Sequence, residues 1–257
     1  MKKKKLWILA AVVLAAAAVG ILTATHDRPV EPIVMEAPSQ DSPMGPRKIM
    51  NYDGHRYAFL ENGALYRLED QVGQELGVLE GDILADPQGA GQKDLAATFA
   101  LGGKVRVLAG YDPRFRVAVE LDGSYYICEN VAAVGRDALD LEEYLDAADF
   151  DEIAGSAEIL DHMGREVLTG TEPGWLLDDL REAEPAVLTD EDYASIGQAQ
   201  REGKSFRVEL LLADGTRYGF YLIPELQLAM VGDSKYTLEL SHAEIFDGLE
   251  QGPLPMA

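Results

Sequence analysis

The stretch RFRVAVELDGSYYICEN, residues 114–130, decides the fold class of this chain. Apolar and polar side chains alternate from Arg114 to Leu121, which is the period of a β-strand with one buried face. Asp122-Gly123 is a typical two-residue hairpin turn, and a second strand follows it over 124–130. We therefore expect an antiparallel β-hairpin at this place in the chain.

Counting outward from the turn predicts the register of this hairpin. Cys128 then lies opposite Val117 on the apolar face, where a cysteine behaves as a small hydrophobic residue. Arg116 lies opposite Glu129 on the other face, and we expect this charged pair to face solvent. The register therefore predicts a buried, unreactive thiol rather than a nucleophile.

Two further turn signals predict hairpins on either side of this one. Asn62-Gly63 separates two strand-like segments, and a tight turn there would pair Phe59 with Tyr66. Asp214-Gly215 separates the segments 206–212 and 216–222, both of which are fairly apolar on both faces. We expect the second of these hairpins to be a central pair of strands buried on both sides.

Short helices with recognisable start signals separate the strands. These signals are the N-terminal capping pairs Asp140/Glu143, Thr189/Asp192 and Ser241/Glu244, together with Pro173, which suits a first helical turn. Strands and helices together predict an α+β fold, rich in β-hairpins and closed by short capping helices.

The order of these elements predicts two units of about 100 residues, a common domain size. The first covers residues 48–149 and the second 150–252, and each runs through β-hairpins before ending in a capped helix. One continuous β-rich domain is the alternative, because the halves share no visible sequence identity. Residues 253–257 are expected to form a short tail.

The N-terminus predicts a membrane anchor. Lys2, Lys3, Lys4 and Lys5 precede an uncharged run from Leu6 to Ala24, long enough to cross the hydrocarbon core of a bilayer as a helix. Lysines on one side favour a cytoplasmic N-terminus and an extracytoplasmic remainder. We expect a retained signal anchor over 6–24, after the basic flank 1–5; cleavage and secretion is the alternative. The proline-rich segment 25–47 is expected to be a tether.

The charge of the chain excludes a nucleic-acid partner, because 45 acidic residues against 22 basic ones give a formal charge of -23. Many of the acids gather between Asp137 and Asp192, where the only basic residues are Arg165 and Arg181. We call the following residues of this region the acidic belt: Asp140, Glu142, Glu143, Asp146, Asp149, Asp151, Glu152, Asp178, Asp179, Asp190, Glu191 and Asp192.

Three interpretations of the acidic belt are open. It can be a solvated surface that aids solubility, a calcium site, or a docking surface for an envelope protein with a basic surface. A calcium-binding EF-hand is excluded, because Ile153 and Ala154 occupy positions of that motif that require a ligand and a glycine. We favour the solvated surface.

No catalytic motif is present in the sequence. The four histidines lack zinc-site spacing, and neither CxxC nor GxSxG occurs. We therefore predict a membrane-anchored, extracytoplasmic, non-catalytic binding, sensory or assembly module of the cell envelope, without a cofactor. The alternatives are an envelope hydrolase that uses paired carboxylates and a calcium-stabilised adhesion element.

Overall fold

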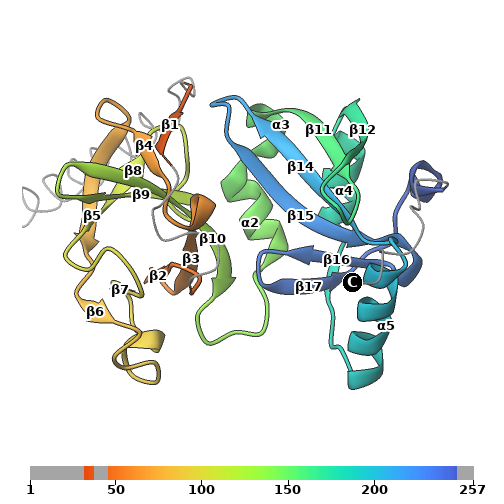
Figure 1. The fold of residues 1–257 in the computed structure, drawn as a ribbon, viewed down its shortest axis with the longest axis horizontal. Helices are drawn as coiled ribbons and strands as arrows, with labels where there is room; N and C mark the ends of the chain where they lie inside the picture. Colours follow the sequence, from red (N-terminus) through yellow and green to blue (C-terminus); the bar gives the residue numbers. More distant parts are fainter. Residues whose placement is uncertain (1–31, 38–45, 248–257) are drawn as a thin grey trace, which may run out of the picture.

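The computed structural model describes residues 32–37 and 46–247, which fold into two β-sheets that lie next to each other with short helices between and around them (Figure 1). The fold is therefore α+β and mostly β, as the hairpin signals predict. Residues 34–133 supply the first sheet and residues 154–237 supply the second.

The first sheet is a 10-stranded sheet that curls into a barrel. Its strands are β1 (Val34–Ala37), β2 (Ile49–Tyr52), β3 (His55–Phe59), β4 (Leu65–Arg67), β5 (Val72–Val78), β6 (Gly81–Asp82), β7 (Ala96–Ala97), β8 (Lys104–Leu108), β9 (Arg116–Leu121) and β10 (Ser124–Ala133). The pairing order β5-β8-β9-β10-β3-β2-β7-β6 begins and ends on one segment, because only Leu79 and Glu80 separate β5 from β6. This continuity closes the barrel.

The hairpin over residues 114–130 is confirmed as β9 and β10, with the predicted register. Ser124 pairs with Leu121 and Cys128 with Val117. Asp122 and Gly123 both have positive φ, 51° and 79°, as the favoured two-residue hairpin turn requires. Cys128, Val117 and Val119 are fully buried in the barrel interior, so the predicted apolar face is also correct.

The hairpin predicted at Asn62-Gly63 is wrong. β3 and β4 do not pair with each other; both pair with β10, through Phe59–Cys128 and Tyr66–Tyr125. The long strand β10 offers pairing positions to both, and a 3-10 turn over Leu60–Asn62 carries the chain from one to the other. The tight turn is instead at Asp53-Gly54, which joins β2 to β3.

The second sheet has 7 strands in the order β12-β11-β14-β15-β16-β17-β13. They are β11 (Ala154–Leu160), β12 (Glu166–Thr171), β13 (Glu184–Pro185), β14 (Phe206–Leu212), β15 (Arg217–Ile223), β16 (Leu228–Val231) and β17 (Ser234–Thr237). The hairpin predicted around Asp214-Gly215 is confirmed as β14 and β15, and it lies at the centre of the sheet. Burial on both sides is wrong for this pair, because Arg207, Arg217 and Tyr221 are exposed on one face.

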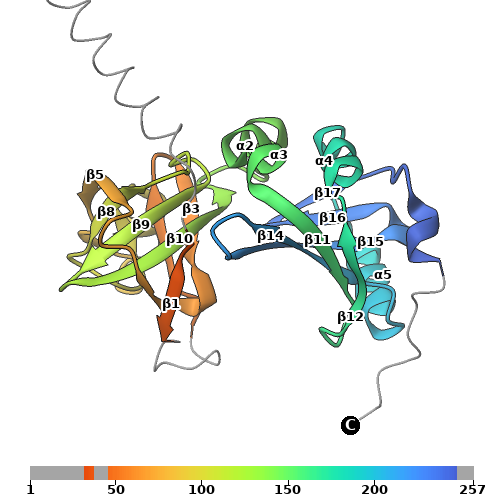
Figure 2. The ribbon, with the colours of Figure 1, turned by 90° about the horizontal axis from the view of Figure 1, so that it is seen from above.

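The helices cover the two faces of the second sheet unequally. They are α2 (Leu141–Ala148), α3 (Phe150–Ile153), α4 (Gly174–Arg181) and α5 (Asp190–Arg201). α2, α3 and α4 pack on one face with Leu222, and α5 packs on the opposite face with Ile223 (Figure 2). Neighbouring residues of a strand point to opposite faces, which explains the division. α2, predicted to close the first unit, thus packs on the second sheet.

Two of the predicted helix starts are confirmed as caps, and one is not. The Asp140 carboxylate accepts from the Glu143 N–H, and Thr189 with Asp192 forms a full capping box. α4 begins immediately after Pro173. The predicted helix after Ser241 is wrong, because a 3-10 turn over Ala243–Phe246 takes its place and the Ser241 backbone N–H donates to Asp179.

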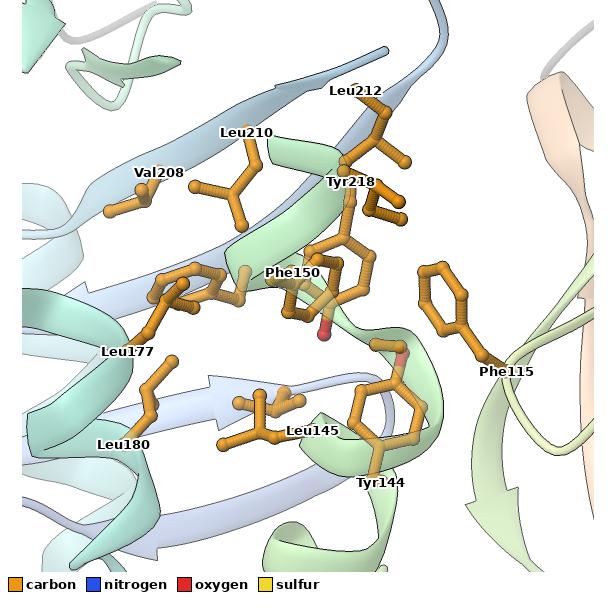
Figure 3. Close-up of a cluster of buried hydrophobic side chains, with 14 of the residues drawn as sticks. Phe115, Tyr144, Leu145, Phe150, Leu177, Leu180, Val208, Leu210, Leu212 and Tyr218 are labelled. Atoms are coloured by element: carbon orange, nitrogen blue, oxygen red, sulfur yellow. The ribbon is translucent and has the colours of Figure 1, made fainter. Parts of the chain in front are cut away.

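The two sheets share one hydrophobic core. Phe115, immediately before β9, inserts between elements of the second half of the chain (Figure 3). Its ring centroid lies 5.3 Å from that of Phe150 and 5.7 Å from those of Tyr144 and Tyr218. Aromatic pairs at such separations add about 0.5–1.5 kcal/mol each beyond the area they bury. The sheets are therefore held by packing rather than by a linker alone. The division into units 48–149 and 150–252 stays a prediction.

The described part of the segment expected to be a tether is a strand of the first sheet. β1 pairs with β4, and the backbone N–H of Ile33 donates to the Asp214 carbonyl oxygen at 2.7 Å. Within residues 32–37 and 46–247, no helix has the length and apolar character needed to cross a membrane. The predicted anchor over 6–24 and the tail 253–257 lie outside the described residues.

Candidate functional site

A cleft of about 650 Å³ lies between the two sheets. β1, β3, β4 and β10 form one wall, and the β14–β15 hairpin forms the other. Six charged side chains line it: Arg47, Glu61, Glu129, Arg207, Glu209 and Arg217. The volume is in the range of small-ligand sites, so this cleft is the candidate functional site.

Under the cleft, the buried guanidinium of Arg116 joins the two sheets. It donates from Nε and Nη2 to Glu129 Oε2, at 3.0 and 2.6 Å. It also crosses to the second sheet, where Nη1 donates to Thr216 Oγ1 at 2.6 Å and Nη2 to the Arg217 carbonyl oxygen at 3.0 Å. The Arg116 side chain therefore fixes the β14–β15 turn against β9 and β10.

A second carboxylate completes the buried network. Asp214 accepts hydrogen bonds from the backbone N–H and the hydroxyl of Thr216, both at 2.7 Å, and from the hydroxyl of Tyr111. Its Oδ2 lies 3.9 Å from Arg116 Nη1. Buried polar groups are costly unless they are paired, and each of these groups has a partner.

The predicted cross-strand pair of Arg116 and Glu129 is confirmed, but its predicted solvent exposure is wrong. The Arg116 side chain is 0% exposed and that of Glu129 is 12% exposed. The outer face of β9 and β10 packs against the second sheet, which removes this pair from water. Burial raises the pKa of Glu129, and the charge of Arg116 offsets part of that rise.

On the cleft wall that the second sheet forms, charged side chains pair across three adjacent strands. The carboxylate of Glu209, on β14, is largely buried and accepts from two arginines. Arg207 Nη2 lies 2.9 Å from Glu209 Oε1, and Arg217 Nη1 lies 2.9 Å from Glu209 Oε2. Arg217 also pairs with Glu158 on β11. We call these four residues the charged ladder.

Gly219 makes room for one ion pair of the charged ladder, that between Arg207 and Glu209. A Cβ at this position of β15 would lie 3.0 Å from Arg207 Nε and 3.1 Å from Arg207 Nη2, closer than ordinary packing allows. The absence of a side chain at Gly219 therefore lets the guanidinium of Arg207 lie over the sheet while its side chain stays 44% exposed.

A second hollow, of about 400 Å³, shares Arg207 of β14 with the cleft. Arg207 lines both spaces, and the other polar or aromatic residues of the second hollow include His162, Gln200, Ser205 and Tyr221. The turn that carries His162 is held by Asp161, which accepts from the backbone N–H groups of Met163 and Arg165. Burial opposes the charge of Asp161, but these bonds outweigh it and lower its pKa.

The structure separates the acidic belt into two groups. Asp140, Glu142, Glu143, Asp146, Asp149, Asp151, Glu152, Asp178 and Asp179 lie on or next to α2, α3 and α4. Asp190, Glu191 and Asp192 occupy the first turn of α5, on the other face of the second sheet. Arg181 bridges part of the first group, at 2.7 Å from Asp151 and 3.4 Å from Asp178.

Neither a metal centre nor a reactive thiol emerges among the described residues. Over 32–37 and 46–247, no group of three His, Cys, Asp or Glu side chains is arranged to hold a metal ion. Cys128 is completely buried, and burial raises the pKa of its thiol well above the ordinary value. The environment that activates a cysteine, a positive and partly exposed one, is the opposite of this.

Sequence reasoning missed the cleft and the residues that build it. One available signal was the position of Arg116 between Phe115 and Val117, a charge inside an apolar run. Arg207 and Glu209 alternate with apolar residues, which signals one polar face of that strand, but the pairing of Glu209 with Arg217 depends on a neighbouring strand and carries no local signal. Comparison of the chain with protein-family models, with curated proteins and with solved structures found no match.

Proposed function

We propose that this protein is a membrane-anchored, extracytoplasmic, non-catalytic binding module of the cell envelope, and that the cleft between its sheets is the binding site. The observation that carries the binding role is the way the charged groups of the cleft are held. Glu209 fixes Arg207 and Arg217, and Arg116 fixes Glu129. Side chains locked by such contacts form a preorganised polar surface, which lowers the entropy lost when a ligand binds.

The same pairing argues against acid–base chemistry. A general acid must carry a proton to give, and a carboxylate nucleophile must be free to attack. Glu129 and Glu209 both line the cleft, and each accepts hydrogen bonds from arginine. These contacts occupy both carboxylates, which suits recognition better than hydrolysis.

A carboxylate-dependent hydrolase is the second candidate, because burial raises the pKa of Glu129 within a cleft that also holds Glu209. A raised pKa is typical of a catalytic acid. This candidate would be favoured over the binding module if the full chain hydrolyses a substrate. Glu209→Gln and Glu129→Gln should then each abolish that hydrolysis while both variants stay folded.

The proposed anchor places the cleft near the membrane surface. Ile33 and Met35 line the cleft, and only eight residues separate Ala24, the end of the predicted span, from Ile33. A fully extended segment of that length reaches about 30 Å. A ligand of this cleft is therefore one found close to the outer surface of the membrane. The acidic belt is a separate candidate surface for a basic protein partner.

Cysteine labelling tests the proposed location. Val187 is 96% exposed, whereas Cys128, the only native cysteine, is fully buried and serves as the internal control. We expect a membrane-impermeant maleimide to label the Val187→Cys variant on intact spheroplasts and to leave the wild-type chain unlabelled. Labelling of the variant only after lysis would contradict an extracytoplasmic module.

A further inference from the structure

We propose that the cleft and the second hollow form one trough that binds an uncharged, extended oligosaccharide. This inference rests on the proposed binding function and names its ligand class. Arg207 lines both spaces, so they meet at this residue on the face of β14 and β15. Tyr221, the cross-strand partner of Arg207, lies on the far side of that meeting point and lines the second hollow.

The length of the trough favours a ligand of several linked units. It starts at Glu61 and Tyr66 of the first sheet and reaches Gln200 of α5 and His162 of the β11–β12 turn. The cleft has a volume of about 650 Å³ and the second hollow about 400 Å³. Two joined spaces of this size suit an elongated molecule better than a single compact one.

The charges of the trough favour a ligand without net charge. Within the charged ladder, Glu158 and Glu209 balance Arg207 and Arg217. Arg47, on the opposite wall, pairs with Asp233. A charged ligand that separates one of these pairs leaves an ion uncompensated, which costs free energy.

Sugar hydroxyl groups match the donors and acceptors that these pairs keep available. A guanidinium has five N–H donors, and a carboxylate can accept at both oxygens. The side chains of Arg207 and Arg217 line the cleft and are 44% and 47% exposed, so part of each guanidinium is accessible from the trough. A hydroxyl both donates and accepts, and it can bridge an arginine and a glutamate without disturbing their pairing.

The second-sheet wall of the trough offers no edge to which an extended peptide could add. A peptide that adds to a sheet needs a free strand edge. β14 is already hydrogen-bonded to β11 and β15, and β15 is bonded to β14 and β16. Only side chains are available on their open face. Tyr221 is 44% exposed and lines the second hollow, and an exposed aromatic ring suits contact with the C–H groups of a sugar.

Calorimetric titration of the full chain tests the ligand class. The protein is held in a polyoxyethylene detergent, which carries no sugar, and the ligands are chitopentaose, cellopentaose, the acidic tetragalacturonate and an uncharged decapeptide. We expect at least one neutral oligosaccharide to bind with a Kd below about 10 mM. We expect tetragalacturonate and the decapeptide to bind at least about tenfold more weakly.

Two variants test whether binding occurs in the trough. Tyr221→Ala removes the ring, and Gly219→Ala adds a Cβ to the cleft lining at 3.0 Å from Arg207 Nε, which forces that guanidinium to shift. Tyr221→Ala is expected to weaken binding at least about tenfold, and Gly219→Ala to weaken it by a smaller factor. Gly155→Ala is the matched control, because its added Cβ meets its nearest neighbour, the Leu211 carbonyl oxygen, at an ordinary 3.8 Å. Circular dichroism and urea unfolding confirm that each variant is folded.

The outcomes separate this inference from the proposed function. Tighter binding of tetragalacturonate or of the decapeptide overturns the ligand class and leaves a binding module. Binding of a neutral oligosaccharide that is unchanged in both trough variants overturns the site. Absence of binding by both neutral oligosaccharides overturns the inference, and cleavage of either one favours the hydrolase. The location of the module is decided independently by the cysteine labelling.

Discussion

The β9–β10 and β14–β15 hairpins are both long and antiparallel, and each lies inside its sheet. Their outer faces differ, because one is buried and the other is open to solvent. The outer face of β9–β10 is buried, and its Arg116 is fully removed from water. The outer face of β14–β15 holds Arg207, Arg217 and Tyr221, which are exposed. One hairpin therefore holds the molecule together, and the other forms the wall of a cleft.

Local sequence pattern does not distinguish the two hairpins. Residues 114–121 alternate as a strand with one polar face does, and so do residues 206–210, where Arg207 and Glu209 alternate with apolar side chains. Alternation reports which side chains fit the sheet to which a strand belongs. It does not report whether a second sheet later covers the outer face. The contrast shows that charge pairs of similar chemistry can be buried between sheets or left open at a cleft, according to what packs on them.

The largest expected effect comes from comparing an arginine of each hairpin. Arg116→Ala leaves Glu129 buried without its partner, and we expect the free energy of unfolding to fall by about 3–5 kcal/mol. Arg217→Ala removes a half-exposed arginine and is expected to cost below about 1 kcal/mol. Urea unfolding of the two variants measures both. Equal losses would contradict the different roles of the hairpins.

The double variant Arg116→Met with Glu129→Leu sharpens that result. Replacing both members of a buried ion pair by apolar residues is often nearly neutral. Asp214 loses the charge of Arg116 at 3.9 Å but keeps its hydrogen bonds from Tyr111 and Thr216. We expect a loss of below about 2 kcal/mol. A loss as large as that of Arg116→Ala would show that the cost does not come from leaving the Glu129 carboxylate unpaired.

Aromatic packing gives the next largest effect. Phe115→Leu removes part of a fully buried ring that contacts three aromatic residues of the second half, and we expect a loss of about 1–2 kcal/mol. Tyr221→Leu, on the open hairpin, is expected to change stability by below about 0.5 kcal/mol. Thermal or urea unfolding measures both losses. A larger loss for Tyr221→Leu than for Phe115→Leu would contradict the different structural roles of the two hairpins.

The buried hairpin also predicts a pH dependence. Because burial raises the folded-state pKa of Glu129, the folded protein binds this proton more tightly than the unfolded chain does. The resulting stabilisation is complete below a pH of about 4 and is lost as the pH rises through the raised folded-state value. We expect the unfolding free energy of the wild type, minus that of Glu129→Gln, to fall as pH rises. Urea unfolding at a series of pH values measures this difference, and a rise would contradict the assigned environment.

A small effect is also expected on the helical face, outside both hairpins. Arg181→Gln removes the bridge to Asp151 and Asp178, which are exposed, so the cost should stay below about 1 kcal/mol. Exposed carboxylates are screened in the same way by any divalent cation. We therefore expect calcium and magnesium at equal concentration to shift the unfolding midpoint of the wild type equally. A shift specific to calcium would favour the adhesion element.

Local signals predicted several elements of this fold correctly because each depends on residues close in sequence. The Asp122-Gly123 turn, the register that buries Cys128 and the Thr189/Asp192 cap are all of this kind. The hairpin predicted at Asn62-Gly63 does not form because β10 is long enough to pair with both flanking segments. Ser241 misled because its backbone N–H is bound by Asp179, a residue distant in sequence. In both cases a tertiary contact replaced the local one.

Local patterns are sufficient to predict the α+β class, the two central hairpins, the register of β9–β10 and the burial of Cys128, because alternation, turn residues and capping act within a few residues. The predictions of an anchor and of an acidic surface depend on composition alone. Tertiary packing is what buries Arg116 and Glu129 and brings Arg207, Glu209 and Arg217 together at a cleft. These outcomes depend on where two sheets pack, and that is governed by shape and apolar area summed over distant residues, which no local pattern records.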